Sequence, residues 1–231
     1  MSTTTIERTI SEIAARTPSS IRVFESLGID YCCGGKRTLT EAAAKAGLTT
    51  DSIVKLLGDA ERGDQPSGTD WLLAPLPDLI AEIVNRHHSF VRREIPRLNT
   101  LIAKVAKRHG PGHPEVLEIE SVFTALGEEL TLHLMKEERI LFPYISGATR
   151  EACFRTVNAP IANMVAEHED AGALLERLRE LTNNYTLPEG ACLSYQALYQ
   201  GLAEFERDLH QHIHLENNIL FPRAIEMEPA G

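Results

Sequence analysis

The chain has 231 residues, enough for one large domain or two smaller ones, and its hydrophobic share of 43% with 24% charged residues is ordinary for a globular protein. The formal net charge of −10 argues against a nucleic-acid-binding surface, and no dense run of Lys and Arg contradicts this. No apolar run approaches the roughly 18 residues of a membrane span, and residues 1–10 lack the layout of a signal peptide. We therefore expect a cytoplasmic protein without membrane or nucleic-acid partners.

Residues 1–62 are predicted to form a small helical module. Short amphipathic helices are expected up to Pro18, over residues 19–27, from Thr38 to Ala46, and from about Thr50 onwards. Thr38 followed three residues later by Glu41 has the spacing of a capping box. Such short helices bury only a modest core, so the module should pack against the rest of the chain or against a partner. A homodimer is one arrangement that we consider.

Residues 63–74 are predicted to be a linker, because the stretch G-D-Q-P-S-G at 63–68 is polar and rich in Gly and Pro. Residues 75–231 should then form a bundle of four long helices, at about 77–109, 115–141, 160–182 and 194–220. Pro96 could kink the first of these helices, and Pro143 should discourage helix beyond the second. No alternating strand pattern occurs, so the predicted fold class is all-α.

A five-residue pattern, H-x3-E, occurs twice in the predicted bundle. His133 and Glu137 recur as His212 and Glu216, an offset of 212 − 133 = 79 residues, and each pair precedes the letters I-L-F-P. Residues four apart lie on one face of a helix, and each pair continues an apolar stripe, which in the first copy ends at Ile140. A buried carboxylate costs several kcal/mol unless it is paired or bound to a cation. The repeat therefore predicts a cation site.

Two further histidines obey nearly the same offset, since 168 − 88 = 80. A lone His on an apolar face is more often a core residue than a ligand, but correspondence within a repeat favours ligation. The offset favours His88 over its neighbour His87, which could instead support the ligands from behind. Four helices would thus direct four imidazoles and two carboxylates to one centre. The predicted metal ligands are His88, His133, Glu137, His168, His212 and Glu216.

The donor types restrict the metal. Imidazoles with carboxylates and no clustered thiolate suit Fe, Mn, Zn or Cu better than Ca or Mg. Zinc normally takes four ligands from one compact site, whereas six ligands with two carboxylates able to bridge suit a pair of ions about 3.5–4 Å apart. Iron is the metal we expect. The ferritin-like pattern, Glu-x-x-His with more carboxylates, is different.

Three motifs in this order carry a resemblance: D-Y-C-C-G-G at 30–35, H-x-M-K-E-E-x-I-L-F-P at 133–143 and H-x-x-x-E-N-N-x-L-F-P at 212–222. The chain resembles the RIC (repair of iron centres) proteins, in which a small N-terminal domain precedes a hemerythrin-like di-iron bundle. The resemblance implies two iron ions with the four histidines as terminal ligands and Glu137 and Glu216 bridging alongside an oxo group. It further implies iron–sulfur client proteins, a role in repairing clusters damaged by nitric oxide or peroxide, and Glu129 and Glu167 as acids beside the ligands.

We expect the iron pair to be labile after reduction, because only two anionic side chains hold it. The leading hypothesis is therefore iron donation rather than turnover catalysis, with Glu129 and Glu167 relaying a proton or guiding departing iron. The alternative for these two residues is that they are solvated surface acids. Alternative functions are a nitric oxide or oxygen scavenger or sensor, and a di-iron reductase of nitric oxide or peroxide.

The four cysteines do not form a secreted-type disulfide framework. Cys32 and Cys33 lie at a predicted turn before two glycines, where backbone N–H groups could lower the pKa of a thiol. We expect a redox or iron-transfer role for this pair rather than a structural one. Cys153 and Cys192 are interpreted as ordinary core or loop residues.

Overall fold

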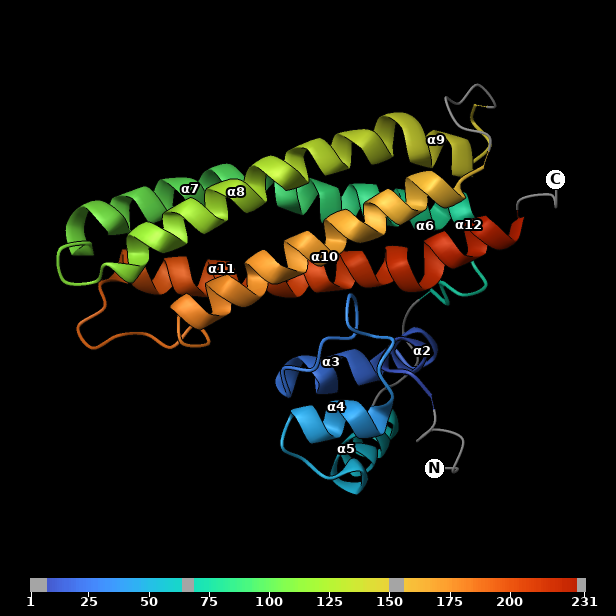
Figure 1. Cartoon of the computed structure of the whole chain (residues 1–231), viewed down its shortest axis with the longest axis horizontal. Coiled ribbons are helices and arrows are strands. Elements are labelled where there is room, and N and C mark those ends of the chain that lie inside the picture. Colours follow the sequence, from blue (N-terminus) through green and yellow to red (C-terminus); the bar gives the residue numbers. More distant parts are fainter. Residues whose placement is uncertain (1–7, 64–68, 150–155, 228–231) are drawn as a thin grey trace. The chain divides into compact units, whose positions relative to one another are not determined.

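A computed structural model describes residues 8–63, 69–149 and 156–227 of the chain. Over these ranges the regular structure is helical, apart from one isolated bridge between Thr9 and Thr38 (Figure 1). The predicted all-α fold is confirmed. None of the helices within these ranges is long and apolar enough to cross a membrane.

The chain divides into two compact units. One consists of Met1–Leu79 with His210–Gly231, and the other of Ile80–Leu209. The second boundary falls inside α11 (Leu193–Leu215), which is one continuous helix.

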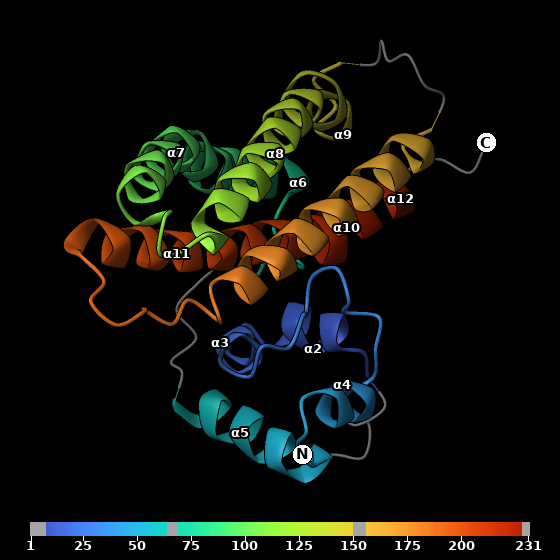
Figure 2. The same ribbon diagram turned by 60° about the vertical axis from the view of Figure 1, so that its left-hand side comes forward.

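The first unit contains the predicted N-terminal module (Figure 2). The capping box of Thr38 and Glu41 is present, and a second one joins Thr9 to Glu12 at the start of the preceding helix. Burial of Phe24, Tyr31 and Leu39 among other apolar side chains gives the module a core of its own. The elements of this unit are α2 (Ile10–Arg16), α3 (Ser19–Ser26), α4 (Leu39–Lys45), α5 (Thr50–Gly63), the start of α6 (Leu76–Glu82), the end of α11, η3 (Glu216–Leu220) and α12 (Phe221–Met227).

The second unit holds most of the long helices. Helix α8 packs along both α7 and α10, as Figure 1 shows. Phe123 of α8 meets Phe205 of α11 edge to face, with ring centroids 5.3 Å apart. The elements are the end of α6, η1 (Ile83–His88), α7 (Ser89–His109), α8 (Glu115–Lys136), η2 (Glu137–Leu141), α9 (Phe142–Ile145), α10 (Asn158–Leu181) and most of α11.

The segments η1, η2 and η3 are π-helical, a local form that the sequence did not predict. The N–H of Phe142 bonds to the carbonyl of Glu137, and the N–H of Phe221 to that of Glu216, five residues back in both cases. A proline follows each phenylalanine, and proline can neither donate a backbone hydrogen bond nor fit against the carbonyl four residues earlier. We attribute the wider turn to this constraint.

The π-turns correct two expectations. The helix does not end before Pro143 but continues as α9, because the proline lies in the first turn of the new segment. Ile140, placed on the buried stripe by a regular period, is 44% exposed, whereas Ile219 at the same position of η3 is 3% exposed. Pro96 lies inside α7, as expected.

Candidate metal centre

The six predicted ligands are all buried, with exposed fractions between 0% and 3%. Three of them belong to π-turns: His88 closes η1, Glu137 opens η2 and Glu216 opens η3. The widened turns thus occur where side chains that carry chemistry must be aimed, as is frequent for π-bulges. The other three, His133, His168 and His212, lie on regular helices.

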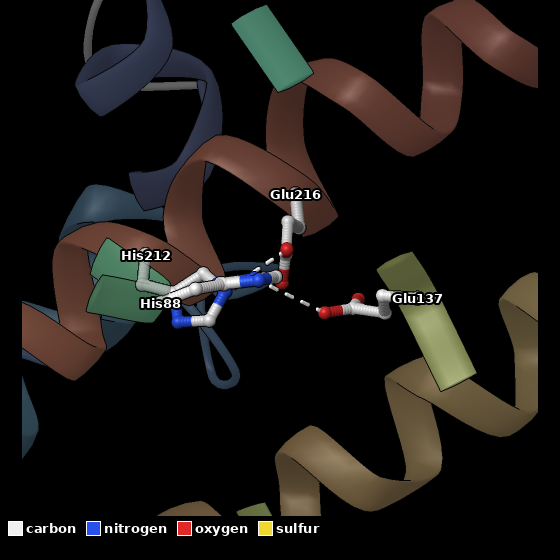
Figure 3. A group of neighbouring side chains, drawn as sticks. All are labelled: His88, Glu137, His212 and Glu216. Atoms are coloured by element: carbon white, nitrogen blue, oxygen red, sulfur yellow. Dashed lines mark hydrogen bonds and ion pairs between the residues drawn. The ribbon is translucent and has the colours of Figure 1, made fainter. Parts of the chain in front are cut away.

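The donor atoms of these residues form two overlapping groups. One group is His88, Glu137, His212 and Glu216, which Figure 3 shows pointing toward one another, and the other is His133, Glu137, His168 and Glu216. Within each group the donor atoms all lie within 4.8 Å of one another. Each group has its own two imidazoles, and both share the same two carboxylates.

Individual distances support this arrangement. The two carboxylate oxygens of Glu137 lie 3.4 Å from Nε2 of His88 and 3.4 Å from Nε2 of His133. Nε2 of His133 is 3.0 Å from Nε2 of His168, and Nε2 of His212 is 2.9 Å from Glu216. Two buried carboxylates among imidazoles require compensating positive charge. The donor set therefore fits a pair of transition-metal ions, and a hard ion such as Ca²⁺ fits it poorly.

Two further carboxylates bind the opposite nitrogens of the histidine rings. Nδ1 of His88 is 2.6 Å from Glu138, and Nδ1 of His133 is 2.9 Å from Glu167. Because an ionised carboxylate can only accept, each imidazole donates from Nδ1 and keeps Nε2 for a metal. Sequence reasoning placed Glu167 beside His168, but its contact is with His133. Sequence reasoning missed Glu138, and its one signal in the sequence was that a second glutamate directly follows Glu137.

Both outer carboxyl groups are held ionised. Partial burial opposes ionisation, but a cationic side chain and the adjacent imidazole outweigh it, so the pKa of each carboxyl is lowered. The cationic partner of Glu138 is Arg92 at 2.8 Å, and that of Glu167 is Lys136 at 2.5 Å.

A cavity of about 250 Å³ reaches two of the candidate ligands from the side of α8 and α10. Glu129, the other predicted outer acid, is on its wall together with Asp170 and Lys136, and His133 and His168 line the same cavity. The structure thus places Glu129 on the wall of the cavity that reaches His133 and His168. The carboxylates along this cavity suit a cation or a proton better than an anion.

Other histidines lie outside both groups. His87 is buried, and its Nδ1 is 3.1 Å from Asp208. His214 is buried two residues after His212, but its Nδ1 is 2.8 Å from the amide of Asn218. This agrees with leaving His87 and His214 out of the predicted set.

The cysteine turn differs from the expectation. The carboxylate of Asp30 accepts the backbone N–H groups of Cys32 and Cys33 at 3.0 Å each and of Gly34 at 2.7 Å, so these donors are not available to a thiolate. The Cys33 thiol, burial and Asp30 together raise the pKa of Cys32. The predicted lowering of the pKa is therefore wrong for Cys32.

The two remaining cysteines are Cys153 and Cys192. Cys192 was interpreted as ordinary, but its Sγ is 3.2 Å from Nε2 of His109. The backbone N–H groups of Tyr195 and Ser194, with Arg108 nearby, lower the pKa of Cys192 despite some desolvation. Cys153 lies outside the described residues.

Comparison with known proteins agrees with this geometry. Residues 79–224 match the hemerythrin HHE cation binding domain, and residues 6–61 match a domain of unknown function, DUF542. The iron-sulfur cluster repair protein YtfE of Pectobacterium atrosepticum is 42% identical over 223 residues, covering 96% of this chain and 98% of the relative. The proteins of that name from Yersinia pseudotuberculosis and Musicola paradisiaca are 42% and 40% identical, with the same coverage. The chain therefore belongs to the YtfE family of iron-sulfur cluster repair proteins, which confirms the resemblance drawn from its three motifs.

Proposed function

We propose that the chain repairs iron–sulfur clusters by supplying iron from a pair of ions held in the bundle. The observation that carries this proposal is the sharing of Glu137 and Glu216 by two groups that each have two further imidazoles. Shared carboxylates are what a bridged pair of ions requires. In this proposal both ions are iron and are also bridged by an oxo group. Reduction of the pair gives ferrous iron, which can then leave the protein.

The charges of the ligand residues favour release of ferrous iron over its permanent retention. The inner donor set contains four neutral imidazoles and only two carboxylates. A ferrous pair carries four positive charges, so two of these charges are left uncompensated by the inner ligands. The outer acids Glu138 and Glu167 hold the rings in place through Nδ1 and, in our proposal, Glu129 draws the departing cation along the cavity.

We further propose that the clients are iron–sulfur proteins damaged by nitric oxide or peroxide, and that the reaction takes place in the cytoplasm. The relatives are named iron-sulfur cluster repair proteins, which supports iron–sulfur proteins as the clients.

The decisive experiment uses the full chain purified without oxygen. Its iron content is measured, and it is mixed with an iron–sulfur enzyme inactivated by nitric oxide. We expect about two irons per chain, as a bridged pair requires, and recovery of client activity in proportion to the iron lost. His168→Gln should lose both properties, whereas His113→Gln, a half-buried histidine outside both groups, should keep them. Full repair by His168→Gln would refute iron donation from this centre.

The second candidate function is binding or reduction of a small molecule such as nitric oxide or oxygen. The cavity that reaches His133 and His168 favours it, because a diatomic ligand could enter there. Multiple turnovers of nitric oxide per chain with an added electron donor, without loss of iron, would favour this function over donation.

A further inference from the structure

We propose that Asp30, Cys32 and Cys33 form a second metal site, which takes a soft or borderline divalent cation through two thiolates and one carboxylate. The assignment of Fe²⁺ as the natural occupant rests on the function proposed above. The existence of the site does not, because it follows from the side chains themselves.

The geometry of the two thiols fits chelation. One donor atom from each of the three residues lies within 4.8 Å of the others. Sγ of Cys32 is 3.6 Å from Sγ of Cys33 and 3.4 Å from a carboxylate oxygen of Asp30. Two thiolates bound at about 2.3 Å to a tetrahedral ion lie about 3.8 Å apart. The sulfur atoms therefore already have the separation that one ion would impose, whereas a disulfide would need about 2.05 Å.

The turn is built to hold this arrangement. Three backbone N–H groups bind the Asp30 carboxylate and fix the chain around it. A Cβ at Gly34 would lie 2.7 Å from that carboxylate, and a Cβ at Gly35 would lie 2.7 Å from the carbonyl oxygen of Tyr31. Both positions thus need glycine for the chain to close this tightly. Preorganisation of this kind is typical of ligand sites.

The same turn is bonded to a segment that carries a ligand of the bundle centre. The amide of Asn218 donates to the backbone carbonyl of Tyr31 at 3.0 Å, and the ring of Tyr31 lies edge-on to His214 with centroids 5.5 Å apart. Asn218 belongs to η3, two residues after Glu216. A metal at the cysteine turn would therefore be coupled through one residue to the π-turn that presents Glu216, which suits a site that receives the ion when it leaves the bundle.

Charge and protons balance in this binding step. Before binding, the site has one carboxylate, from Asp30, and two thiols, from Cys32 and Cys33. A divalent cation displaces one proton from each thiol, both protons pass to solvent, and no electron is transferred. The net charge of the site is unchanged.

Cobalt is the probe, because thiolate ligands give Co²⁺ a strong near-ultraviolet charge-transfer band that His and Glu ligands do not. The metal-free full chain is titrated with Co²⁺ in a non-thiol reductant without oxygen. We expect the band in wild type and its loss in Cys33→Ser, which removes a half-buried thiol outside the module core. Cys192→Ser is the matched control and should retain the band. Asp30→Asn should weaken cobalt binding by at least the roughly 10–100-fold typical of supporting carboxylates.

The outcomes separate this site from the bundle. If cobalt binds only without a thiolate band, the second site does not exist, while iron donation from the bundle stands. If the band persists in Cys33→Ser, or disappears in Cys192→Ser, the assigned residues are wrong. If the band behaves as expected but iron does not reach a client, the site stands and the proposed function fails. Circular dichroism of each variant shows that a lost band is not due to unfolding.

Discussion

Nδ1 of His133 lies 2.9 Å from the carboxylate of Glu167, although in sequence Glu167 is the neighbour of another predicted ligand, His168. The contact joins α8 to α10 and directs Nε2 of His133 toward Glu137. Glu138 makes the equivalent bond to His88. Both histidines are thus oriented by an ionised carboxylate on the ring nitrogen that faces away from the centre.

Removing the outer charge should weaken metal binding without removing a ligand. Loss of such a partner typically costs about 10–100-fold in metal affinity, so we expect a change of that size in Glu167→Gln and in Glu138→Gln. The control is Glu169→Gln, an exposed position on the other side of His168. Competition with a chelator of known affinity measures the change. Equal affinities for all three variants would show that the outer bonds do not support the ligands.

Glu129 should matter for the rate of iron removal rather than for the amount bound. In bulk water, a divalent ion about 6 Å from one carboxylate gains about 1.4 kcal/mol, so Glu129→Gln should slow removal of ferrous iron by a chelator by about tenfold at low salt. Salt should reduce the effect. Glu128→Gln is the matched control, since this exposed neighbour does not line the cavity. If both variants release iron at the same rate, Glu129 is only a surface acid.

The sequence predicted the positions of the helices and of the six candidate ligands better than the contacts between helices. Helical period, caps and the internal repeat were sufficient to place the helices, and the six candidate ligands come together as expected. These signals are local or depend on one face of one helix. The partner of Glu167, by contrast, depends on the rotation of α10 against α8, which no period in the sequence specifies.

The predicted pKa at the cysteine turn was wrong for a related reason. The N–H groups expected to stabilise a thiolate were assigned from the turn itself, but Asp30, two residues earlier, competes for them and takes all three. Asp commonly binds backbone N–H groups a few residues onward, so this competitor was visible in the sequence. The lowering of the pKa of Cys192 could not be seen in the sequence, because it depends on the start of α11 and on Arg108 from a distant segment.

The two cysteine environments predict opposite reactivities. A thiolate is the nucleophile, so iodoacetamide at neutral pH should label Cys192 well before Cys32, which is 4% exposed and has a raised pKa. Mass spectrometry of peptides after brief labelling measures the order, and His109→Gln tests whether the contact with Cys192 contributes. Faster labelling of Cys32 would mean that the turn opens readily in solution.

The prolines after η2 and η3, Pro143 and Pro222, should control the geometry of the ligands that these two π-turns carry. Pro143→Ala restores a backbone donor and removes the ring, so η2 can relax to a regular helix and rotate Glu137 relative to α9 by up to about 100°. We expect lower metal occupancy at unchanged helical content by circular dichroism. Pro160→Ala is the control, because Pro160 lies in the first turn of α10, where its missing N–H would be unbonded anyway. Unchanged occupancy in Pro143→Ala would show that the π-turn does not depend on proline.

Glu94, which is not one of the candidate metal ligands, allows a test of how the free energy of unfolding depends on pH. Burial opposes its ionisation, but hydrogen bonds from Arg93 at 3.0 Å and Arg97 at 2.5 Å outweigh it, so the pKa of Glu94 is lowered. The unfolded chain then binds more protons around pH 4, and stability rises with pH. The contribution is complete above the unfolded pKa of about 4.3 and is lost as the pH falls through the lower folded pKa.

Glu94→Gln should therefore cost roughly 1 kcal/mol of unfolding free energy at pH 7, because both arginines are substantially exposed and the pair is screened. The difference from wild type should shrink toward zero in acid, when the wild-type carboxyl is also neutral. Urea unfolding midpoints at both pH values measure this difference, with the exposed Glu128→Gln as the variant that should show none. A wild-type advantage that is constant with pH would mean that Glu94 stabilises α7 by packing rather than by its charge.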